Sequence, residues 1–241
     1  MTAFSAHTRG ERLPRGRADH AIVVNSVSLV ADPEGALYWP DQGLLAVADL
    51  HLEKGSSFAA RGVLLPPYDT AATLARLARL ITHYAPRCVV ALGDSFHDGG
   101  GPERLADVDR DALTIMQRGR EWIWITGNHD PEPATGIGGI FIETMISGAL
   151  TFRHLPTGSS GEISGHLHPV ARVAHRGRAV SRRCFAADAT RMIMPAFGAF
   201  TGGLNIRDAM FADVFGTLSF KAHLLGDGRL YAFAAKRCLP D

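Results

Sequence analysis

The sequence predicts an α/β fold with α+β character, in which a second β-sheet packs against the first. Residues 43–126 alternate apolar, strand-like runs with segments of helical periodicity, which is typical of a mainly parallel sheet. From Gly136 onward the chain is rich in glycine and in short strand-like runs, which predicts a mostly antiparallel sheet. No stretch resembles an interdomain linker, so we predict one domain at residues 21–241, preceded by a flexible, mildly basic tail at residues 1–20.

The composition limits the class of protein. With 46% hydrophobic and 20% charged residues the chain resembles an ordinary globular protein, and a net charge of +1 gives no global attraction to nucleic acid or membranes. A local basic patch would still suffice to bind DNA. No apolar run reaches about 18 residues, so no membrane span is expected. The three cysteines are widely spaced without a C-x-x-C pair, which argues against a disulfide framework or a thiolate zinc site and fits a reducing cytoplasm.

The elements of the first half follow from periodicity and turn residues. Residues 21–38 predict two strands joined at the turn of residues 33–35, and residues 43–47 predict a third. Residues 52–67 predict a loop with a short helix. Asp69 can cap a helix that runs to Tyr84, and apolar residues recur along one face of it. That face carries Leu74, Leu77, Ala78, Ile81 and Tyr84.

The next strand is predicted at residues 88–92. After the glycine-rich break at residues 99–102, a second amphipathic helix is predicted to about Arg118. Its apolar face would carry Leu105, Val108, Ala112, Ile115 and Met116. A strand ending at Thr126 follows. Short strand-like runs fill the second half at residues 139–146, 149–154, 172–175, 179–185, 191–197 and 229–235, with a hairpin turn at residues 226–228.

Metal-capable side chains recur where predicted strands end. The four motifs are Asp49-x-His51, Gly93-Asp94, Asn128-His129-Asp130 and His166-x-His168. Residues 49 and 51 would point the same way if the extended conformation persists. In α/β sheets, binding sites are built at this carboxyl edge. With His154, the candidate ligands are Asp49, His51, Asp94, Asn128, His129, His154, His166 and His168.

Each candidate ligand also has an ordinary structural explanation. Asn128 or Asp94 could cap a turn, and His154 could be a satisfied polar residue at a strand end. All of these explanations holding together is improbable. Oxygen and nitrogen ligands without sulfur suit Mn²⁺, Fe or Zn²⁺ better than Mg²⁺ or Ca²⁺. The set is too large for one tetrahedral ion and sufficient for two divalent ions, which the Asp94 carboxylate could bridge.

These motifs, in this order over residues 49–168, resemble those of the calcineurin-like metallophosphoesterases. The resemblance implies a two-sheet β-sandwich flanked by helices, with four layers in the order αββα. It implies that Asp49, His51 and His168 bind the first metal, that Asp94 bridges, and that Asn128 and His166 bind the second. The family has one more metal-binding His between the last two motifs, and His154 is the only His in that interval. His129 corresponds to the histidine that faces substrate without binding metal.

The second motif departs from the family pattern. The family usually has Gly-Asp-x-x-Asp/Glu, whereas this chain has His97 at the acidic position and Asp98 after it. The bridging role of Asp94 is unaffected, but the hydrogen bonds around the ligands must differ. Two roles for His97 stay open. It could contact a substrate phosphate or stabilise a leaving group, or it could only support the ligands.

A narrower resemblance covers nearly everything after residue 20. The runs ADLHLEKGSSFAARGVLLPPYDT, LGDSFHD, GEISGHLHP and MPAFGAFTGGLN are similar to those of the ligase-associated DNA damage response endonucleases (PdeM), a bacterial subfamily. That resemblance implies an Mn²⁺-dependent phosphodiesterase that acts in DNA repair with a DNA ligase, a helicase and a nuclease. The motifs themselves do not identify DNA as the substrate.

The expected mechanism follows from two-metal chemistry. Two cations roughly 3.5–4 Å apart can hold a bridging hydroxide that attacks phosphorus in line. His129 could protonate the departing oxygen, and Asp130 could orient that ring or serve the loop. No G-x-S-x-G motif suggests a serine nucleophile.

Substrate contacts are less defined. Residues 172–183 contain five arginines and no acid, and Arg172, Arg176, Arg178 and Arg182 are candidates for phosphate binding. A solvated basic hairpin explains the same residues. Phe197, Phe200 and the glycines at 198–203 could stack on a base or pack into the core. Hydrolysis of a small nucleotide-type diester or pyrophosphate is an alternative function, and a non-catalytic scaffold is a third. The oligomeric state stays open.

Overall fold

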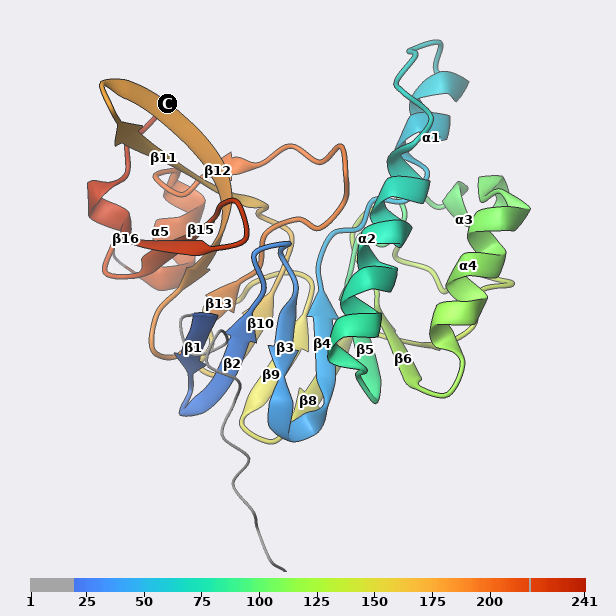
Figure 1. The fold of residues 1–241 in the computed structure, drawn as a ribbon, viewed down its shortest axis with the longest axis horizontal. Coiled ribbons are helices and arrows are strands. Elements are labelled where there is room, and N and C mark those ends of the chain that lie inside the picture. Colours follow the sequence, from blue (N-terminus) through green and yellow to red (C-terminus); the bar gives the residue numbers. More distant parts are fainter. Residues whose placement is uncertain (1–19, 217) are drawn as a thin grey trace, which may run out of the picture.

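The computed structural model describes residues 20–216 and 218–241, so the predicted tail lies, apart from residue 20, outside the described residues. Two sheets lie face to face (Figure 1). The first sheet has the spatial order β1 to β7, in which β1–β4 are antiparallel neighbours and β4–β7 parallel ones. Its strands are β1 (Ala21–Val24), β2 (Val27–Ala31), β3 (Leu37–Trp39), β4 (Leu44–Val47), β5 (Cys88–Leu92), β6 (Glu121–Ile125) and β7 (Ile140–Ile142).

The second sheet has the order β14-β11-β12-β13-β10-β9-β8, and β15 and β16 extend it beside β12. Antiparallel pairs predominate, although β10 runs parallel to both of its neighbours. Its strands are β8 (Thr144–Ser147), β9 (Leu150–Arg153), β10 (Glu162–Ser164), β11 (Pro169–His175), β12 (Arg178–Ala187), β13 (Met192–Ile193), β14 (Leu204–Asn205), β15 (Lys221–Leu225) and β16 (Leu230–Ala234).

Helices cover the outer faces of both sheets. On the first sheet, α2 (Asp69–Tyr84) and α4 (Asp107–Gln117) bury leucines against β4, β5 and β6. On the second, α5 (Ala209–Phe215) packs Phe211 and Phe215 against Phe220 and the outer face of β12. The shorter α1 (Lys54–Ala60) and α3 (Gly101–Arg104) follow β4 and β5. Short 3₁₀ helices lie at Pro40–Gln42 and Ala235–Arg237.

A continuous core between the sheets fixes their face-to-face packing. Ala46, Val90 and Leu92 from the first sheet pack with Phe152 and Phe185 from the second. With the two helical faces this makes four layers, and each layer buries apolar side chains against the next. The predicted α/β sandwich of two sheets flanked by helices is therefore confirmed. The assignment of residues 21–241 to one domain stays a prediction.

Several predicted elements were wrong in detail. The first predicted strand is two, because Asn25 and Ser26 both have positive φ and turn the chain into a β1–β2 hairpin. With β2–β3 and β3–β4, this hairpin makes three of the six strand pairs of the first sheet antiparallel, so that sheet is not mainly parallel as predicted. The run at residues 139–146 is divided between the sheets, with β7 in the first and β8 in the second.

Two helix predictions also need correction. Met116 is buried as predicted, but Val108 and Ile115 are 73% and 60% exposed, and Leu113, which was not predicted, completes the apolar face of α4. Asp69 is the first residue of α2 rather than its cap, and its carboxylate accepts the backbone N–H of Gly55. Helix α5 was not predicted.

Candidate metal centre

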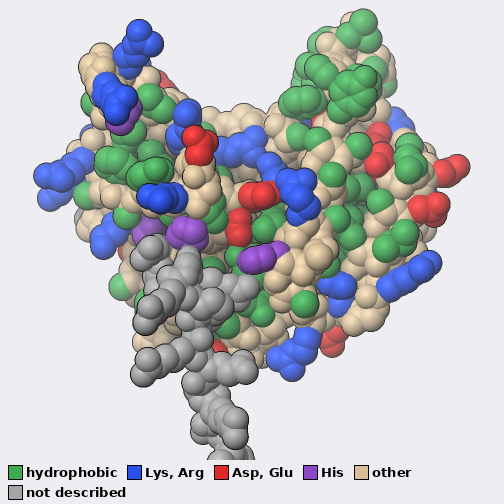
Figure 2. All heavy atoms as spheres, in the orientation of Figure 1, with side chains coloured by type: hydrophobic (Ala, Val, Ile, Leu, Met, Phe, Trp, Pro, Cys, Tyr) green, Lys and Arg blue, Asp and Glu red, His purple; other side chains and the backbone are tan. Residues whose placement is uncertain are grey.

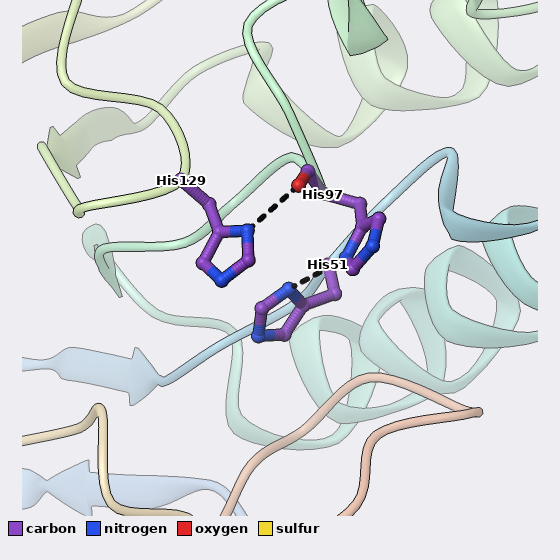
Figure 3. Close-up of side chains that lie close together, drawn as sticks. All are labelled: His51, His97 and His129. Carbon is purple, nitrogen blue, oxygen red and sulfur yellow. Dashed lines mark hydrogen bonds between the residues drawn. The ribbon is translucent and has the colours of Figure 1, made fainter. Parts of the chain in front are cut away.

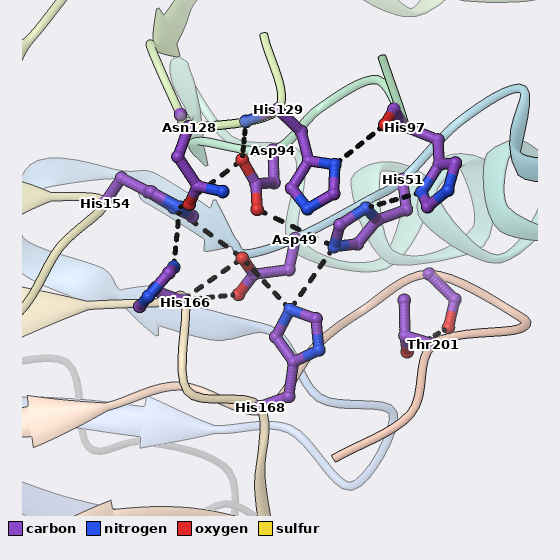
Figure 4. A network of polar contacts seen from close by, with 12 residues as sticks. Asp49, His51, Asp94, His97, Asn128, His129, His154, His166, His168 and Thr201 are labelled. Atoms are coloured by element: carbon purple, nitrogen blue, oxygen red, sulfur yellow. Dashed lines mark hydrogen bonds and ion pairs between the residues drawn. The ribbon is translucent and has the colours of Figure 1, made fainter. Parts of the chain in front are cut away.

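The predicted ligands converge at one edge of the two sheets. Asp49 and His51 follow β4, Asp94 follows β5, Asn128 follows β6, and the loop after β10 supplies two histidines (Figure 4). Because β4, β5 and β6 are parallel neighbours, their carboxyl ends meet at this edge. His154 follows β9, which lies beside β10 in the second sheet, so both sheets contribute side chains to the cluster.

The ligand loops are not extended. Five predicted ligands have left-handed backbone conformations, a region that non-glycine residues rarely adopt. Their φ angles are 54° for Asp49, 44° for His51, 44° for Asp94, 70° for His166 and 45° for His168. The expectation that residues 49 and 51 converge through an extended strand was therefore wrong. Positive φ values at the strand ends turn these side chains toward one another, and such strain concentrates at functional sites.

The first ligand group consists of Asp49, His51 and His168. The Nε2 atoms of the two histidines are 3.3 Å apart, and His168 Nε2 lies 3.3 Å from Asp49 Oδ1. These three side chains can offer ligand atoms within 4.8 Å of one another. Asp49 is fully buried and also accepts the backbone N–H of His166, which ties this group to the next loop.

The second group consists of Asp94, His154 and His166, with Asn128 beside it. His154 Nε2 lies 2.9 Å from Asn128 Oδ1, 3.2 Å from His166 Nδ1 and 3.4 Å from Asp94 Oδ1. The other carboxylate oxygen of Asp94, Oδ2, lies 3.9 Å from His51 Nε2 in the first group. Asp94 thus presents one oxygen to each group, which is the geometry of a bridging ligand.

The protonation pattern fits metal ions. His154 Nδ1 faces the Leu92 carbonyl at 3.0 Å, so that nitrogen carries a proton and Nε2 points into the cluster. Burial, and then His168, lower the pKa of His51 to about 3. Burial alone would raise the pKa of Asp94, but the hydrogen bond and charge of His154 lower it. The ionised Asp94 carboxylate therefore lies close to the neutral ring of His51, and lone pairs of both side chains converge.

A divalent cation bound between these side chains would reduce the repulsion between their lone pairs. Protonation of His154 would reduce the same repulsion in the absence of a metal. Burial opposes that proton, but the Asp94 and Asp49 carboxylates raise the pKa of His154. The donor set of two carboxylates, four imidazoles and one amide suits two ions of the Mn²⁺, Fe or Zn²⁺ class.

Glycines allow the ligand loops to approach one another. A Cβ at Gly93 would overlap the ring of His154, and one at Gly127 would overlap the backbone nitrogen and Oδ1 of Asp94. A Cβ at Gly165 would lie 2.6 Å from Asp49 Oδ2. The glycines before the motifs are thus part of the site, because only glycine leaves room for the neighbouring ligand.

The Asp130 carboxylate joins the loop after β5 to the loop after β6 through hydrogen bonds to the backbone. Its Oδ2 accepts the backbone N–H groups of Ser95 and Phe96, and its Oδ1 accepts that of Gly127. Burial raises the pKa of this carboxyl to about 6 despite these bonds. None of the contacts described for residues 20–216 and 218–241 joins Asp130 to the ring of His129. Of the two roles left open for Asp130, the contacts match the loop role.

His97 and His129 form the outer wall of the cluster (Figure 3). His129 Nδ1 donates to the His97 carbonyl at 2.8 Å, and the two rings stack with centroids 5.3 Å apart. His97 Nδ1 lies 3.4 Å from His51 Nδ1. His51 would use Nε2 toward the first group, so its Nδ1–H can point to His97. Both outer histidines also border a pocket of about 400 Å³ that contains His51, His166 and His168.

The predicted phosphate-binding arginines lie on the β11–β12 hairpin, away from that pocket. In the hairpin register Arg172 faces Ser181, while Arg182 faces Ala171 and Arg178 faces His175. Side chains alternate between the two faces of a sheet, so Arg172 lies on the face opposite to Arg178 and Arg182. Arg172 also donates to the Pro240 carbonyl. The four arginines therefore do not form one patch, and none lines the pocket around the ligands.

The hairpin nevertheless shapes the surface beside the site. Figure 2 shows two projections with a hollow between them. The β11–β12 hairpin forms one and carries arginine side chains, while α1 and the segment after it form the other, largely hydrophobic one.

The sequence did not single out two half-buried arginines that hold the loop after β13. Arg183 donates to the carbonyls of Ala196, Gly198 and Ala199, and the Arg76 guanidinium lies 4.0 Å from the Phe197 ring centroid. Phe197 is buried, so core packing explains it, whereas Phe200 is 41% exposed and its carbonyl accepts Lys54. The low-acid run at residues 172–183 was the only signal for Arg183, since its burial depends on the fold.

Comparison with known proteins identifies the class of this centre. Residues 44–183 match the model of the calcineurin-like phosphoesterase family. The chain belongs to this family. The crystal structure of Pseudomonas putida nuclease MPE is similar, with 28% sequence identity, a TM-score of 0.69, and coverage of 88% of this chain and 98% of that one. The prediction of a metal-dependent phosphodiesterase is confirmed by this membership and this likeness.

A second structure is more distant. The phosphoesterase Yfce from E. coli matches with 14% identity and a TM-score of 0.38, over 80% of this chain and 98% of that one. No curated protein matches significantly. The likeness to nuclease MPE is consistent with the narrower endonuclease resemblance.

Two further observations concern the described part of the chain. In residues 20–216 and 218–241, no helix combines the length and the apolar character needed to cross a membrane. All three cysteines are buried, and none forms a disulfide in the structure.

Proposed function

We propose that this phosphoesterase uses two divalent ions, most simply Mn²⁺, to hydrolyse phosphodiester bonds in DNA as an endonuclease. The convergence of all seven predicted ligands on one edge of the sandwich carries the proposal. Their roles are those of the family. Asp49, His51 and His168 would hold one ion, Asn128, His154 and His166 would hold the other, and Asp94 would be a ligand of both. When bound, the two ions activate a water molecule for in-line attack and neutralise charge on the phosphoryl oxygens.

The outer histidines act on the substrate side. His129 is exposed, and its Nδ1–H is held by the His97 carbonyl, so Nε2 is directed away from that carbonyl and can give a proton to the leaving oxygen. His97 accepts the Nδ1–H of His51 and thereby orients this ligand, in the position where relatives have an acid. Asp130 fixes the loops that carry Asp94 and Asn128.

DNA is the proposed substrate for two reasons. A similar chain is a nuclease, and the exposed arginines of the hairpin can attract a phosphate backbone to the hollow. Action in DNA repair beside a ligase, a helicase and a nuclease, in the cytoplasm, follows the subfamily resemblance. A small nucleotide-type diester or pyrophosphate is the second candidate, because the pocket of about 400 Å³ would hold one nucleotide. The complete ligand set disfavours a non-catalytic scaffold.

The test begins with chelator-stripped protein. Bis(4-nitrophenyl) phosphate and 4-nitrophenyl phosphate are assayed before and after addition of Mn²⁺, followed by supercoiled plasmid DNA. Mn²⁺-dependent turnover that favours the diester, together with nicking of a closed circle, is the expected result. Turnover of small diesters without any cleavage of DNA would favour the second candidate. No turnover with Mn²⁺, Fe²⁺ or Zn²⁺ would contradict the enzyme assignment.

A further inference from the structure

We propose that a pocket beside the metal centre is a phosphate-binding subsite, which receives a phosphate carried by the leaving group of the substrate. This proposal rests on the phosphodiesterase function proposed above. The pocket, of about 370 Å³, lies between α1, α3 and the loops after β5 and β6. It is lined by Ser57, Ala60, Arg61, His97, Asp98, Arg104 and His129.

This pocket shares a wall with the metal centre. His97 and His129 border both it and the pocket that contains His51, His166 and His168. A substrate bound across the metal centre would therefore pass these two rings and reach the second pocket. If His129 protonates the leaving oxygen, the group attached to that oxygen lies beside this ring, and the second pocket, which the same ring borders, can receive it.

Two guanidinium groups beside this pocket are held by hydrogen bonds to Ser56 and Ser57 of α1 and to Asp98. Arg61 donates to the carbonyl and hydroxyl oxygens of Ser57, and its guanidinium lies 4.6 Å from the Phe58 ring centroid. The Asp98 carboxylate pairs with Arg104 at 2.7 Å. Arg104 further donates to the Ser56 hydroxyl at 2.9 Å. Neighbouring side chains thus hold both arginines before any ligand arrives, which lowers the ordering cost of binding.

These hydrogen bonds leave donors for a ligand. The Nη1 groups of both arginines donate no hydrogen bond among the contacts described here, whereas the Nε and Nη2 groups do. Gly100 leaves the room for Arg104, because a Cβ there would lie 2.7 Å from Nη1. Two guanidinium groups and one carboxylate leave a net charge of +1. A guanidinium with free N–H groups is the side chain best suited to phosphate oxygens.

The chemical class of ligand is a phosphorylated alcohol. Its phosphate can be the next one along a polynucleotide or a terminal phosphate on a short oligonucleotide. Both offer the same oxygens to Arg61 and Arg104, so the subsite predicts a preference for diesters whose leaving group bears a second phosphate.

Dinucleotides test this preference. Hydrolysis of thymidylyl-(3′→5′)-thymidine by the Mn²⁺-loaded protein is compared with hydrolysis of the same dinucleotide carrying a 5′-terminal or a 3′-terminal phosphate. One of the two terminal phosphates should raise kcat/KM about tenfold, and its position identifies the leaving side. Arg61→Gln should abolish most of this ratio, and Arg61→Lys should keep part of it, because it retains the charge without the planar fork.

Arg118→Gln is the matched control, because Arg118 is exposed at the end of α4 and outside the pocket. It should keep the full ratio. Gly100→Ala should lower the ratio by displacing Arg104. A ratio near one in the wild type, or a full ratio in Arg61→Gln, would overturn the subsite while the metal-dependent cleavage of the unphosphorylated dinucleotide upheld the proposed function.

A binding measurement tests the phosphate subsite independently of catalytic turnover. Calorimetry compares thymidine 3′,5′-bisphosphate with the two thymidine monophosphates on the Mn²⁺-loaded protein. Tighter binding of the bisphosphate by about tenfold, lost in Arg61→Gln, would support the subsite even if no dinucleotide is cleaved. Equal affinities in the wild type and Arg61→Gln would refute it.

Discussion

The metal-ligand cluster and the β11–β12 hairpin differ in how firmly their charged groups are held. Asp49, Asp94 and His154 are at most 3% exposed, and each contacts side chains or backbone of other loops. Arg176 and Arg178 are exposed at the turn of the hairpin, and Arg176 itself has a positive φ of 47°. The charged side chains of the cluster are therefore fixed in place by their contacts, whereas those at the turn of the hairpin are exposed to solvent.

The ligand cluster and the hairpin also differ in how much their charged residues cost in stability. Left-handed ligand residues and buried carboxylates cost stability, roughly 1–3 kcal/mol for each strained residue, and such costs persist where a ligand repays them. An exposed arginine costs little, and salt screens its attraction to phosphate. We therefore expect the cluster to determine the rate of diester hydrolysis and the hairpin to affect how readily DNA associates with the protein.

The largest effect should follow loss of a ligand. His168→Ala and Asn128→Ala, one from each group, should lower Mn²⁺-dependent diester hydrolysis by about 10³-fold or more, because the affected ion loses a ligand that fixes its position. Initial rates at saturating Mn²⁺ measure this. His83→Ala, on the exposed side of α2, serves as the histidine control and should retain activity. Full activity in both ligand variants would refute the dinuclear assignment.

Backbone crowding in the cluster gives the next effect. Gly127→Ala would drive a methyl group into Asp94, so we expect about 10²-fold lower activity and roughly 1–3 kcal/mol lower stability. Rates and urea unfolding of the metal-free protein measure the two losses. Gly99→Ala is the control, because its Cβ would meet open space. Wild-type behaviour of Gly127→Ala would show that the ligand loops are looser than the hydrogen bonds of Asp94 and Asp130 indicate.

A variant of His97 tests whether this residue supports the metal ligand His51 or contacts the substrate. If it orients His51, His97→Ala should raise the Mn²⁺ concentration needed for half-maximal activity by about 10–100-fold. His97→Gln, which keeps an acceptor, should recover part of that loss. The measurement is a Mn²⁺ titration with diesters of good and poor leaving groups. An unchanged Mn²⁺ requirement with a loss confined to poor leaving groups would assign His97 to the substrate instead.

The sequence was sufficient to predict where the ligands gather. The first three motifs follow apolar runs, and the carboxyl ends of the parallel strands β4, β5 and β6 necessarily share an edge. The second sheet marks the limit of this logic, because it supplies His154 after β9 and His166 and His168 after β10, and strand order within the first sheet does not place these residues. The left-handed conformations of Asp49 and His51 were not predictable, since their side chains leave no sequence signal comparable with glycine.

Other errors have local physical causes. The turn at Asn25 and Ser26 was hidden by β-branched residues on both sides, so two short strands appeared as one. In α4 the apolar residues are too few to define one face, and contact with α2 selects Leu113 and Met116. The arginine run predicted a patch because charge was counted along the chain, whereas the hairpin places successive residues on opposite faces.

The smallest effect should come from the hairpin. Arg176→Gln combined with Arg178→Gln removes two exposed charges, so DNA affinity should fall by several-fold at moderate salt and the salt dependence of binding should weaken by up to about two phosphate contacts. Hydrolysis of bis(4-nitrophenyl) phosphate should not change, because neither residue lines the pocket around the ligands.

Fluorescence anisotropy with labelled DNA over a salt series, with Ca²⁺ in place of Mn²⁺, measures binding without cleavage. Lys236→Gln and Arg237→Gln remove the same charge from the 3₁₀ helix near the C-terminus and provide the comparison. If both pairs weaken DNA binding equally, the effect belongs to net charge, and the hairpin has no special part in bringing DNA to the metal centre.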